Sequence, residues 1–354
     1  MTYDEIIAAE RVPASDPGPG PVEDSGLQFF AESADEPSGQ VRWERFPAEG
    51  FWRGSLKTSS GTVTARMPGR NHGRVTQADL TSTVDPDPSE GFRPPWLPGE
   101  FLPRMAPRET HLPPVPRRGP TDAPALPLRF IQQPNRAWPW CTVGRVFYGH
   151  GTNLAHNNAG TGVLVGRDLL LTASHLAPWG ERPGNWWMHF VPAYSNGTPY
   201  LMGSSYVRSF YGVRNEGDGD VTGLDYVICK LYEPLGDQCG WMGTQSWGNT
   251  DAYYSYDWIS VGYPETFFVG ELPAVQFAIG IKDIDGDGDG LELETVDFTA
   301  HGWSGGPLWN RINGDPKVVG VLSGREKDGL DPRRSVFAGG HHMVSLVKLA
   351  PALV

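Results

Sequence analysis

The sequence predicts an all-β fold, a barrel or a sandwich, preceded by a proline-rich and largely irregular N-terminal extension. Downstream of Phe130, short segments of alternating or continuous apolar residues recur between turn signals, without long helical periodicity. Upstream, the first 129 residues hold 20 of the 33 prolines, which disfavour helices and central strands there. The organisation of the chain therefore changes near residue 130.

The extension is expected to cover residues 1–129. Thirteen of its prolines lie between Asp85 and Leu128, a composition typical of extended or disordered backbone. Aromatic residues and a Thr/Val alternation in Val41 to Met67 predict a hairpin that docks on the rest of the chain. Two interpretations stand side by side: a pro-segment removed by cleavage at Arg117-Arg118 or Arg129, and a permanent tail.

The second part of the chain contains ten expected strands. They are CTVGRVFY (141–148), GVLVG (162–166), LLLTAS (169–174), WWMHFV (186–191), DYVICKLY (225–232), WISVGY (258–263), AVQFAIGI (274–281), LELETVDF (291–298), KVVGVLS (317–323) and RSVFAG (334–339). The segment HHMVSLVKL (341–349) predicts a terminal helix.

Charge and hydropathy limit the partners. The chain carries 29 basic and 41 acidic residues, a formal net charge of −12, so we expect no nucleic-acid partner. No segment approaches the ~18 apolar residues of a membrane span, so we expect no membrane partner. The three cysteines allow a bond between Cys229 and Cys239 that leaves Cys141 unpaired, or three free thiols.

Ser304 lies in a glycine-rich segment, TAHGWSGGPLW (299–309), whose backbone is expected to bend and expose one hydroxyl. The segment fits G-x-S-x-G, the elbow of α/β-hydrolases, in which a helix follows the serine and the acid and histidine come later. It also fits G-x-S-G-G-P, in which the amides of Gly302 and Ser304 form an oxyanion hole. Pro307 predicts a strand or turn behind the motif, which favours the second interpretation.

A histidine and an aspartate precede this serine, each at the end of an expected strand. His175 follows the buried strand of residues 169–171. Asp225 stands at the head of a strand in which Val227, Cys229 and Leu231 share one face. The order is His175, Asp225, Ser304, with gaps of 50 and 79 residues.

This order is one in which Ser–His–Asp triads occur. A serine hydroxyl does not ionise at neutral pH, so an imidazole has to accept its proton during attack. The imidazole needs a carboxylate that fixes its tautomer and stabilises its cation. Each residue alone has an ordinary structural explanation, but the three in this order and spacing predict a nucleophilic serine.

The segments 171–175, 225–227 and 302–307 resemble the motifs of the chymotrypsin-fold serine peptidases, over roughly residues 131–354. The approach to the first strand, residues 135–147, is similar to that of the glutamyl endopeptidase branch. The roles that the resemblance implies are general base for His175, orienting acid for Asp225, nucleophile for Ser304, and oxyanion hole for the amides of Gly302 and Ser304.

The same resemblance implies a peptidase domain at residues 130–354, built from two six-stranded antiparallel barrels. The barrels are expected at about 130–240 and 250–354, split near 235–255, with the triad in the cleft between them. The implied activity is that of a serine endopeptidase, a monomer that cleaves protein or peptide substrates through an acyl-enzyme and needs no cofactor for catalysis. The family is usually secreted, and the sequon Asn196-Gly197-Thr198 fits secretion, although no signal peptide is recognisable at Met1.

Two departures from the family pattern lie at the motifs themselves. Leu176 stands where animal members carry a cysteine, so that disulfide is absent. Trp303 stands where the family usually has an aspartate that pairs with a newly cut N-terminus, so activation has to differ.

The substrate pocket is expected to include Thr299, His301, Ser323 and Arg325. The glutamyl branch recognises a carboxylate partly through a histidine on the strand after the serine, but residues 317–324 hold none. Positive charge has three alternative sources, His301, Arg325 and His341, so specificity for glutamate stays open.

One further motif, DIDGDGDGLELE (283–294), matches an EF-hand calcium loop at positions 1, 3, 5, 6 and 12. It predicts a structural calcium ion with the ligands Asp283, Asp285, Asp287, Asp289 and Glu294. The flanks predict strands rather than helices, and an acidic hairpin tip explains the same residues through turn chemistry alone.

Two other functions stay open at this stage. A distortion of the oxyanion hole by Trp303 would make the chain a catalytically inactive binding module. An esterase of the elbow type is the other, and chain order and Pro307 disfavour it.

Overall fold

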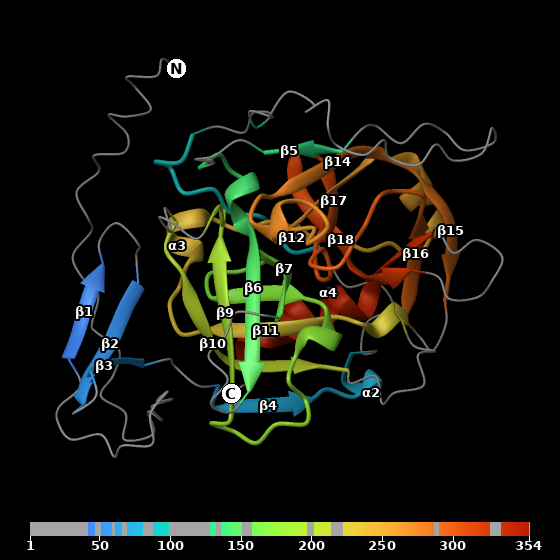
Figure 1. Cartoon of the computed structure of the whole chain (residues 1–354). Coiled ribbons are helices and arrows are strands. Elements are labelled where there is room, and N and C mark those ends of the chain that lie inside the picture. The colour runs from blue at the N-terminus through green and yellow to red at the C-terminus, as the bar shows by residue number, and fades with distance from the viewer. Residues whose placement is uncertain are drawn as a thin grey trace.

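The computed structural model of the 354-residue chain describes residues 42–46, 51–58, 61–65, 69–80, 88–98, 103, 128–131, 136–150, 158–196, 202–213, 222–286, 290–325 and 334–353. Two large β-sheets form most of this part, and its longest helix is α4 (His341–Leu349), at the position expected for a terminal helix (Figure 1). None of the described helices has the length and apolar character needed to cross a membrane. The predicted all-β class is confirmed.

The first sheet is a closed barrel. Its strands are β6 (Val143–His150), β7 (Asn158–Leu164), β8 (Leu169–Thr172), β9 (Trp186–Pro192), β10 (Ser205–Gly212) and β11 (Val227–Leu231). They pair in the order β11-β8-β7-β6-β9-β10, and a further antiparallel pairing of β10 with β11 closes the ring. Strand β11 alternates as predicted, because Val227, Cys229 and Leu231 pack inside the barrel while Ile228 packs outside it.

The second sheet curls without closing in the described part of the chain. Its strands are β5 (Arg129–Phe130), β12 (Gly243–Thr244), β13 (Trp258–Gly262), β14 (Ala274–Ile279), β15 (Ile281–Asp285), β16 (Leu291–Thr295), β17 (Pro307–Ile312), β18 (Asp315–Arg325) and β19 (Ser335–Gly339). They pair in the order β15-β16-β19-β18-β17-β13-β14-β5, with β12 on β18. Only Gly280 separates β14 from β15, which lie near opposite edges of this sheet, so the sheet has to curl. The expected second barrel is a half-barrel, because β15 turns into a hairpin with β16 instead of pairing with β14.

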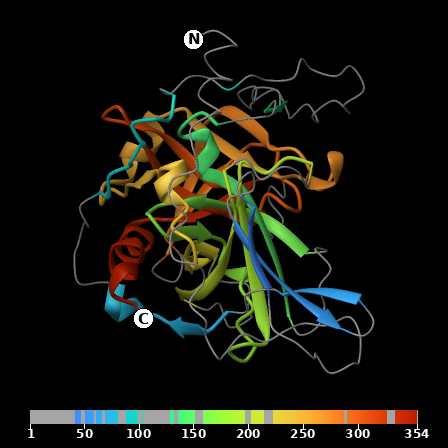
Figure 2. The same cartoon turned by 90° about the vertical axis from the view of Figure 1, so that its left-hand side faces the viewer.

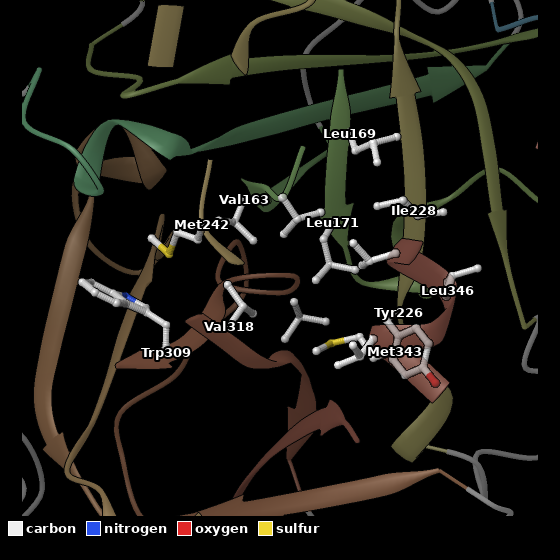
Figure 3. Close-up of a cluster of buried hydrophobic side chains, with 14 of the residues drawn as sticks. Val163, Leu169, Leu171, Tyr226, Ile228, Met242, Trp309, Val318, Met343 and Leu346 are labelled. Carbon is white, nitrogen blue, oxygen red and sulfur yellow. The ribbon is translucent and has the colours of Figure 1, made fainter. Parts of the chain in front are cut away.

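A shared apolar core joins the two sheets. Figure 3 shows side chains of the barrel, such as Val163 and Leu171, beside Val318 of the second sheet and Met343 of α4. The junction runs from the end of β11 to the start of β13 and holds the short helices α3 (Gly236–Cys239) and η4 (Thr250–Ser255), near the split expected at residues 235–255.

The segment expected to form one hairpin, Val41 to Met67, contains three strands. They are β1 (Arg42–Phe46), β2 (Phe51–Thr58) and β3 (Gly61–Ala65), paired antiparallel in that order as a separate sheet. A second turn after Thr58 adds the third strand.

A later part of the predicted extension is built into the folded body, and we call residues 69–80 and 88–98 the N-terminal strap. Strand β4 (Asn71–Arg74) pairs parallel with β10, and helix α2 (Gln77–Leu80) packs beside α4, as Figure 2 shows. Val75 and Leu80 are buried in the shared core. The extension is therefore less irregular than predicted, because no proline stands between Pro68 and Pro86 to prevent pairing and packing there.

The rest of the strap lies on the junction. Backbone bridges link Ser89 with Thr244 and Phe92 with Trp241, and Leu97 is buried in the barrel core. The side chain of Lys317 is 4% exposed and contacts Glu90 at 2.8 Å, so a charge of the second sheet has its partner in the strap.

The three cysteines are free and buried, as in the free-thiol alternative. The Cys141 thiol donates to the carbonyl of Cys239 at 3.4 Å, and burial raises the pKa of Cys141 to about 12. These thiols therefore stay protonated at neutral pH and act as small apolar groups.

Candidate active site

His175 is held by the end of a buried strand. Strand β8 has every residue buried, and one turn of 3₁₀ helix, η2 (Ser174–Leu176), follows it. The His175 side chain is 43% exposed, so a rigid backbone presents an accessible imidazole.

Asp225 lies beside His175 because their strands are paired. Val227 of β11 faces Thr172 of β8, so the residues just before β11 and just after β8 meet at one end of the barrel. Asp225 Oδ1 accepts from the His175 amide at 2.9 Å, and Asp225 Oδ2 lies 2.7 Å from His175 Nδ1. The carboxylate is an acceptor, so Nδ1 carries the hydrogen and Nε2 is free to accept one.

Ser323, on β18, makes a third hydrogen bond to this carboxylate. Its hydroxyl donates to Asp225 Oδ2 at 2.6 Å. Asp225 is 9% exposed, and three donors hold it in a fixed orientation. The sequence predicts Ser323 in the substrate pocket, and no local pattern indicates its longer-range contact with Asp225.

The pKa of His175 lies above its ordinary value of 6.5. Desolvation is the largest contribution and lowers this pKa, but the hydrogen bond to Asp225 and the negative charge of its carboxylate raise it and together outweigh desolvation. Asp225 therefore stabilises the imidazolium that forms when His175 accepts a proton.

Ser304 is half-buried in a sharp turn ahead of β17. Gly302 and Gly305 have φ of +87° and +80°, a region that side-chain-bearing residues rarely adopt. A Cβ on Gly302 would lie 2.2 Å from the carbonyl oxygen of Tyr263, and one on Gly305 would lie 2.2 Å from the hydroxyl of Thr172. The glycines of the motif are therefore required by this turn.

Thr161 of β7 fastens the turn to the barrel. Its amide donates to the Ser304 carbonyl at 2.8 Å, and its hydroxyl donates to the Gly302 carbonyl at 2.7 Å. Thr172, at the end of the strand that leads to His175, donates its hydroxyl to the Thr161 carbonyl at 2.6 Å. Ser304 and His175 are thus positioned by the same pair of strands, although no hydrogen bond joins their side chains in the described structure.

The amides of Gly302 and Ser304 take no part in these contacts. Their carbonyls are bound to Thr161, and neither amide donates to another group within the described residues. Two free backbone N–H groups on either side of Trp303 are the donors that a developing oxyanion requires.

The expected pocket residues do not all come together. Thr299 is buried and shares a hydrogen bond of 2.8 Å with Ser335, and the Arg325 guanidinium donates to the Thr299 carbonyl. His301 is exposed, and His341 lies at the start of α4, with its ring tilted against that of His342. Of the three cationic candidates, Arg325 is the one with a described contact to Thr299, and the substrate pocket itself stays a prediction.

The acidic motif forms an antiparallel hairpin in which Asp283 and Glu294 face each other across β15 and β16. Arg334 lies on both carboxylates, 3.3 Å from Asp283 and in contact with Glu294. Asp285 is exposed, and Asp287 and Asp289 lie outside the described residues. Calcium binding here stays a prediction, and the ion would compete with the Arg334 guanidinium.

Comparison with known proteins finds matches among solved structures. No family model matches the chain, and no curated protein matches it. A structure of Glu endopeptidase with MPD has a TM-score of 0.48 and 16% identity, and the match covers 62% of this chain and 94% of that one. Protease Anisep from Arthrobacter nicotinovorans has 0.47 and 20%, over 61% and 97% of the two chains. The thermostable serine protease AL20 from an extremophilic microorganism has 0.45 and 15%, over 61% and 99%.

The chain is thus similar to solved structures of a Glu endopeptidase, a protease and a serine protease. Identities of 20% or less concern the fold alone, so the activity has to be inferred from the residues of this chain.

Proposed function

We propose that this protein is a serine endopeptidase that cleaves peptide bonds through a covalent acyl-enzyme. The observation that supports it most is the array Ser323–Asp225–His175, which fixes an accessible imidazole at the barrel end where the Ser304 turn is fastened. A fixed carboxylate beside an accessible imidazole is the arrangement that a general base requires.

In the proposed mechanism, Ser304 Oγ attacks the substrate carbonyl carbon while His175 Nε2 accepts the hydroxyl proton. The carbonyl oxygen becomes an oxyanion and binds the amides of Gly302 and Ser304. Collapse of this intermediate breaks the C–N bond, and His175 gives its proton to the departing amine. Water then attacks the ester by the same route, and Ser304 regains its proton from His175.

Two observations weigh against the alternative functions. Ser304 is followed by strand β17, whereas an α/β-hydrolase elbow leads into a helix. The Trp303 side chain is fully buried in the core of the second sheet, which favours an intact oxyanion hole over the distortion that an inactive module would require. Both observations favour the peptidase.

The test is reaction of the intact protein with a fluorophosphonate probe, followed by a peptide library. We expect one equivalent of probe on Ser304, located by mass spectrometry, and cleavage of internal peptide bonds. Absence of labelling would leave the inactive module as the function, and labelling with cleavage of esters only would indicate an esterase.

The pH dependence follows from the raised pKa of His175. We expect kcat/KM to rise with pH, with a midpoint above 6.5, because protonated His175 cannot accept the Ser304 proton. In Asp225→Asn the carboxylate charge that raises this pKa is lost, so the acidic limb should move to lower pH and the maximum should fall by roughly 10⁴-fold. Asp237→Asn, on a surface carboxylate paired with Arg167, is the control and should leave the profile unchanged. A limb that stays in place in Asp225→Asn would contradict the assignment.

We further propose that Arg325 selects an acidic residue on the acyl side of the cleaved bond. Its guanidinium reaches the carbonyl of Thr299, five residues before Ser304, and can offer its remaining donors to a carboxylate. Arg325→Gln is expected to lower kcat/KM for peptides with glutamate at this position by about 10- to 100-fold, the effect of losing one charged hydrogen bond.

The control for this prediction is a second peptide and a second arginine. Peptides with leucine in place of glutamate should be cleaved equally by Arg325→Gln and the parent protein. Arg311→Gln, an exposed arginine on β17, should change neither rate. Equal losses on both peptides would mean that Arg325 supports the fold of the pocket and does not select charge.

A further inference from the structure

Trp303, the residue between Gly302 and Ser304, gives the turn a second anchor in addition to Thr161. Its side chain is fully buried in the core of the second sheet, with Leu308 and Phe337. The indole Nε1 donates to the hydroxyl of Ser260 on β13 at 3.0 Å. The two ends of the side chain are therefore fixed, one by packing and one by a directed bond.

Two glycines, Gly262 and Gly306, make room for this indole. A Cβ on Gly262 would lie 2.3 Å from the indole, and a Cβ on Gly306 would lie 2.6 Å from it. The aromatic ring of Phe298 approaches it edge-on, with 6.5 Å between centroids. Only glycine at these two positions allows the indole to lie flat against the backbone.

The backbone of Trp303 is fixed as well. Its amide donates to the Ala300 carbonyl at 3.0 Å, and its carbonyl accepts from the Gly306 amide at 2.8 Å. The Ser304 amide belongs to the peptide group that follows Trp303, and the Gly302 amide belongs to the His301–Gly302 peptide group, one residue further back. Fixing the side chain and backbone of Trp303 therefore orients the Ser304 amide directly and holds the turn that carries the Gly302 amide.

The contacts just described are neutral, and all come from residues 260–337. The possible cleavage site Arg129 lies in β5, where Phe130 pairs with Ala274 and the amide of Ile131 donates to the Pro273 carbonyl at 2.9 Å. A new N-terminus made there would remain bound in the sheet by these same hydrogen bonds.

We infer that Trp303 is a positioning residue that holds the oxyanion turn in its working shape in the uncut chain, so that activity does not require cleavage near residue 129. This inference rests on the proposed peptidase function. If Trp303 holds the turn, peptidase activity does not depend on removal of the N-terminal extension, because an anchor made of neutral groups needs no charged N-terminus created by cleavage.

The first experiment uses the full chain with Arg117, Arg118 and Arg129 all replaced by glutamine, its intact mass verified. Trypsin cannot cut this variant at these three positions. We expect the variant to react with the fluorophosphonate probe at the same rate as the parent protein, both when the parent is intact and when it has been cut by limited tryptic digestion. Reaction only after cleavage would overturn the inference and leave the peptidase function standing. Absence of reaction before and after cleavage would overturn both.

The second experiment compares substitutions of two buried tryptophans, Trp303 in the turn and Trp258 elsewhere in the same core. Trp303→Leu is expected to lower kcat by about 10²- to 10³-fold with little change in KM, as loss of an oxyanion donor does. Trp303→Phe should recover most of this loss, because it refills the space. Ser260→Ala should cost less than about 10-fold, the effect of one neutral hydrogen bond.

Trp258 supplies the matched control, since it is fully buried in the same core and its Nε1 donates to the Tyr253 carbonyl at 2.8 Å. Trp258→Leu should lower the melting temperature as much as Trp303→Leu while kcat of the folded enzyme is retained. Equal losses of kcat in the two leucine variants would show that Trp303 acts only through stability and would overturn its positioning role.

Discussion

Replacement of Ser304 by alanine is expected to reduce peptide hydrolysis by on the order of 10⁶-fold and to abolish fluorophosphonate labelling. In the proposed mechanism this hydroxyl supplies the atom that attacks the carbonyl, and alanine has no such group. The turn itself is held through backbone atoms of Gly302 and Ser304, so the variant should fold with an unchanged melting temperature.

His175→Ala should lose nearly as much activity, because nucleophile and base act as a unit. Two controls match these variants. Ser255→Ala and His150→Ala remove an exposed serine on η4 and an exposed histidine at the end of β6, and both should leave hydrolysis unchanged. Retained hydrolysis in Ser304→Ala or His175→Ala would refute the proposed mechanism.

A protein that begins at residue 99 is expected not to fold stably. Its truncation removes Val75, Leu80 and Leu97, three side chains that are 4%, 0% and 4% exposed. Burial of each contributes about 1.5–3 kcal/mol, and their sum is comparable with the 5–15 kcal/mol that stabilises a typical domain. The truncation also leaves the buried Lys317 without Glu90, which adds the cost of an incompletely compensated charge.

A protein that begins at residue 69 is the control, because it keeps the whole strap. It should retain a cooperative thermal transition and full probe labelling. A point variant, Leu80→Ala, should lower the free energy of unfolding by about 2–5 kcal/mol without changing the rate of labelling. If the protein that begins at residue 99 unfolds at the same temperature as the full chain, the strap is a dispensable tail.

Much of the barrel could be predicted because its signals are local. The alternation in β11 and the run of leucines in β8 both identify strands from neighbouring residues alone. His175 and Asp225 lie side by side because of the register between these strands. The order of the motifs indicates that the two residues meet, but the residues of each strand alone do not specify the register. Their catalytic roles stay predictions.

Contacts between distant parts of the chain could not be read from the sequence. Thr161 and Ser323 are ordinary polar residues in apolar strands, and only the packing of the two sheets brings them to the turn and to Asp225. The strap was missed for a related reason. The proline-rich segments around the strap predict irregular backbone. The apolar residues through which it packs into the core, such as Leu80, are too few to show a helical or strand periodicity.

The placement of α4 has a consequence for the order of events during synthesis. The barrel that holds His175 and Asp225 emerges from the ribosome well before Ser304, and α4 emerges later still. Met343 and Leu346 of α4 complete the core between the two sheets, and α2 of the strap rests on that helix. A nascent chain therefore contains His175 and Asp225 before it contains Ser304 and before Ser323 completes the hydrogen bonds of Asp225. If the proposed function holds, we expect proteolysis to begin only after α4 has packed into the core, so that its onset coincides with the completion of folding.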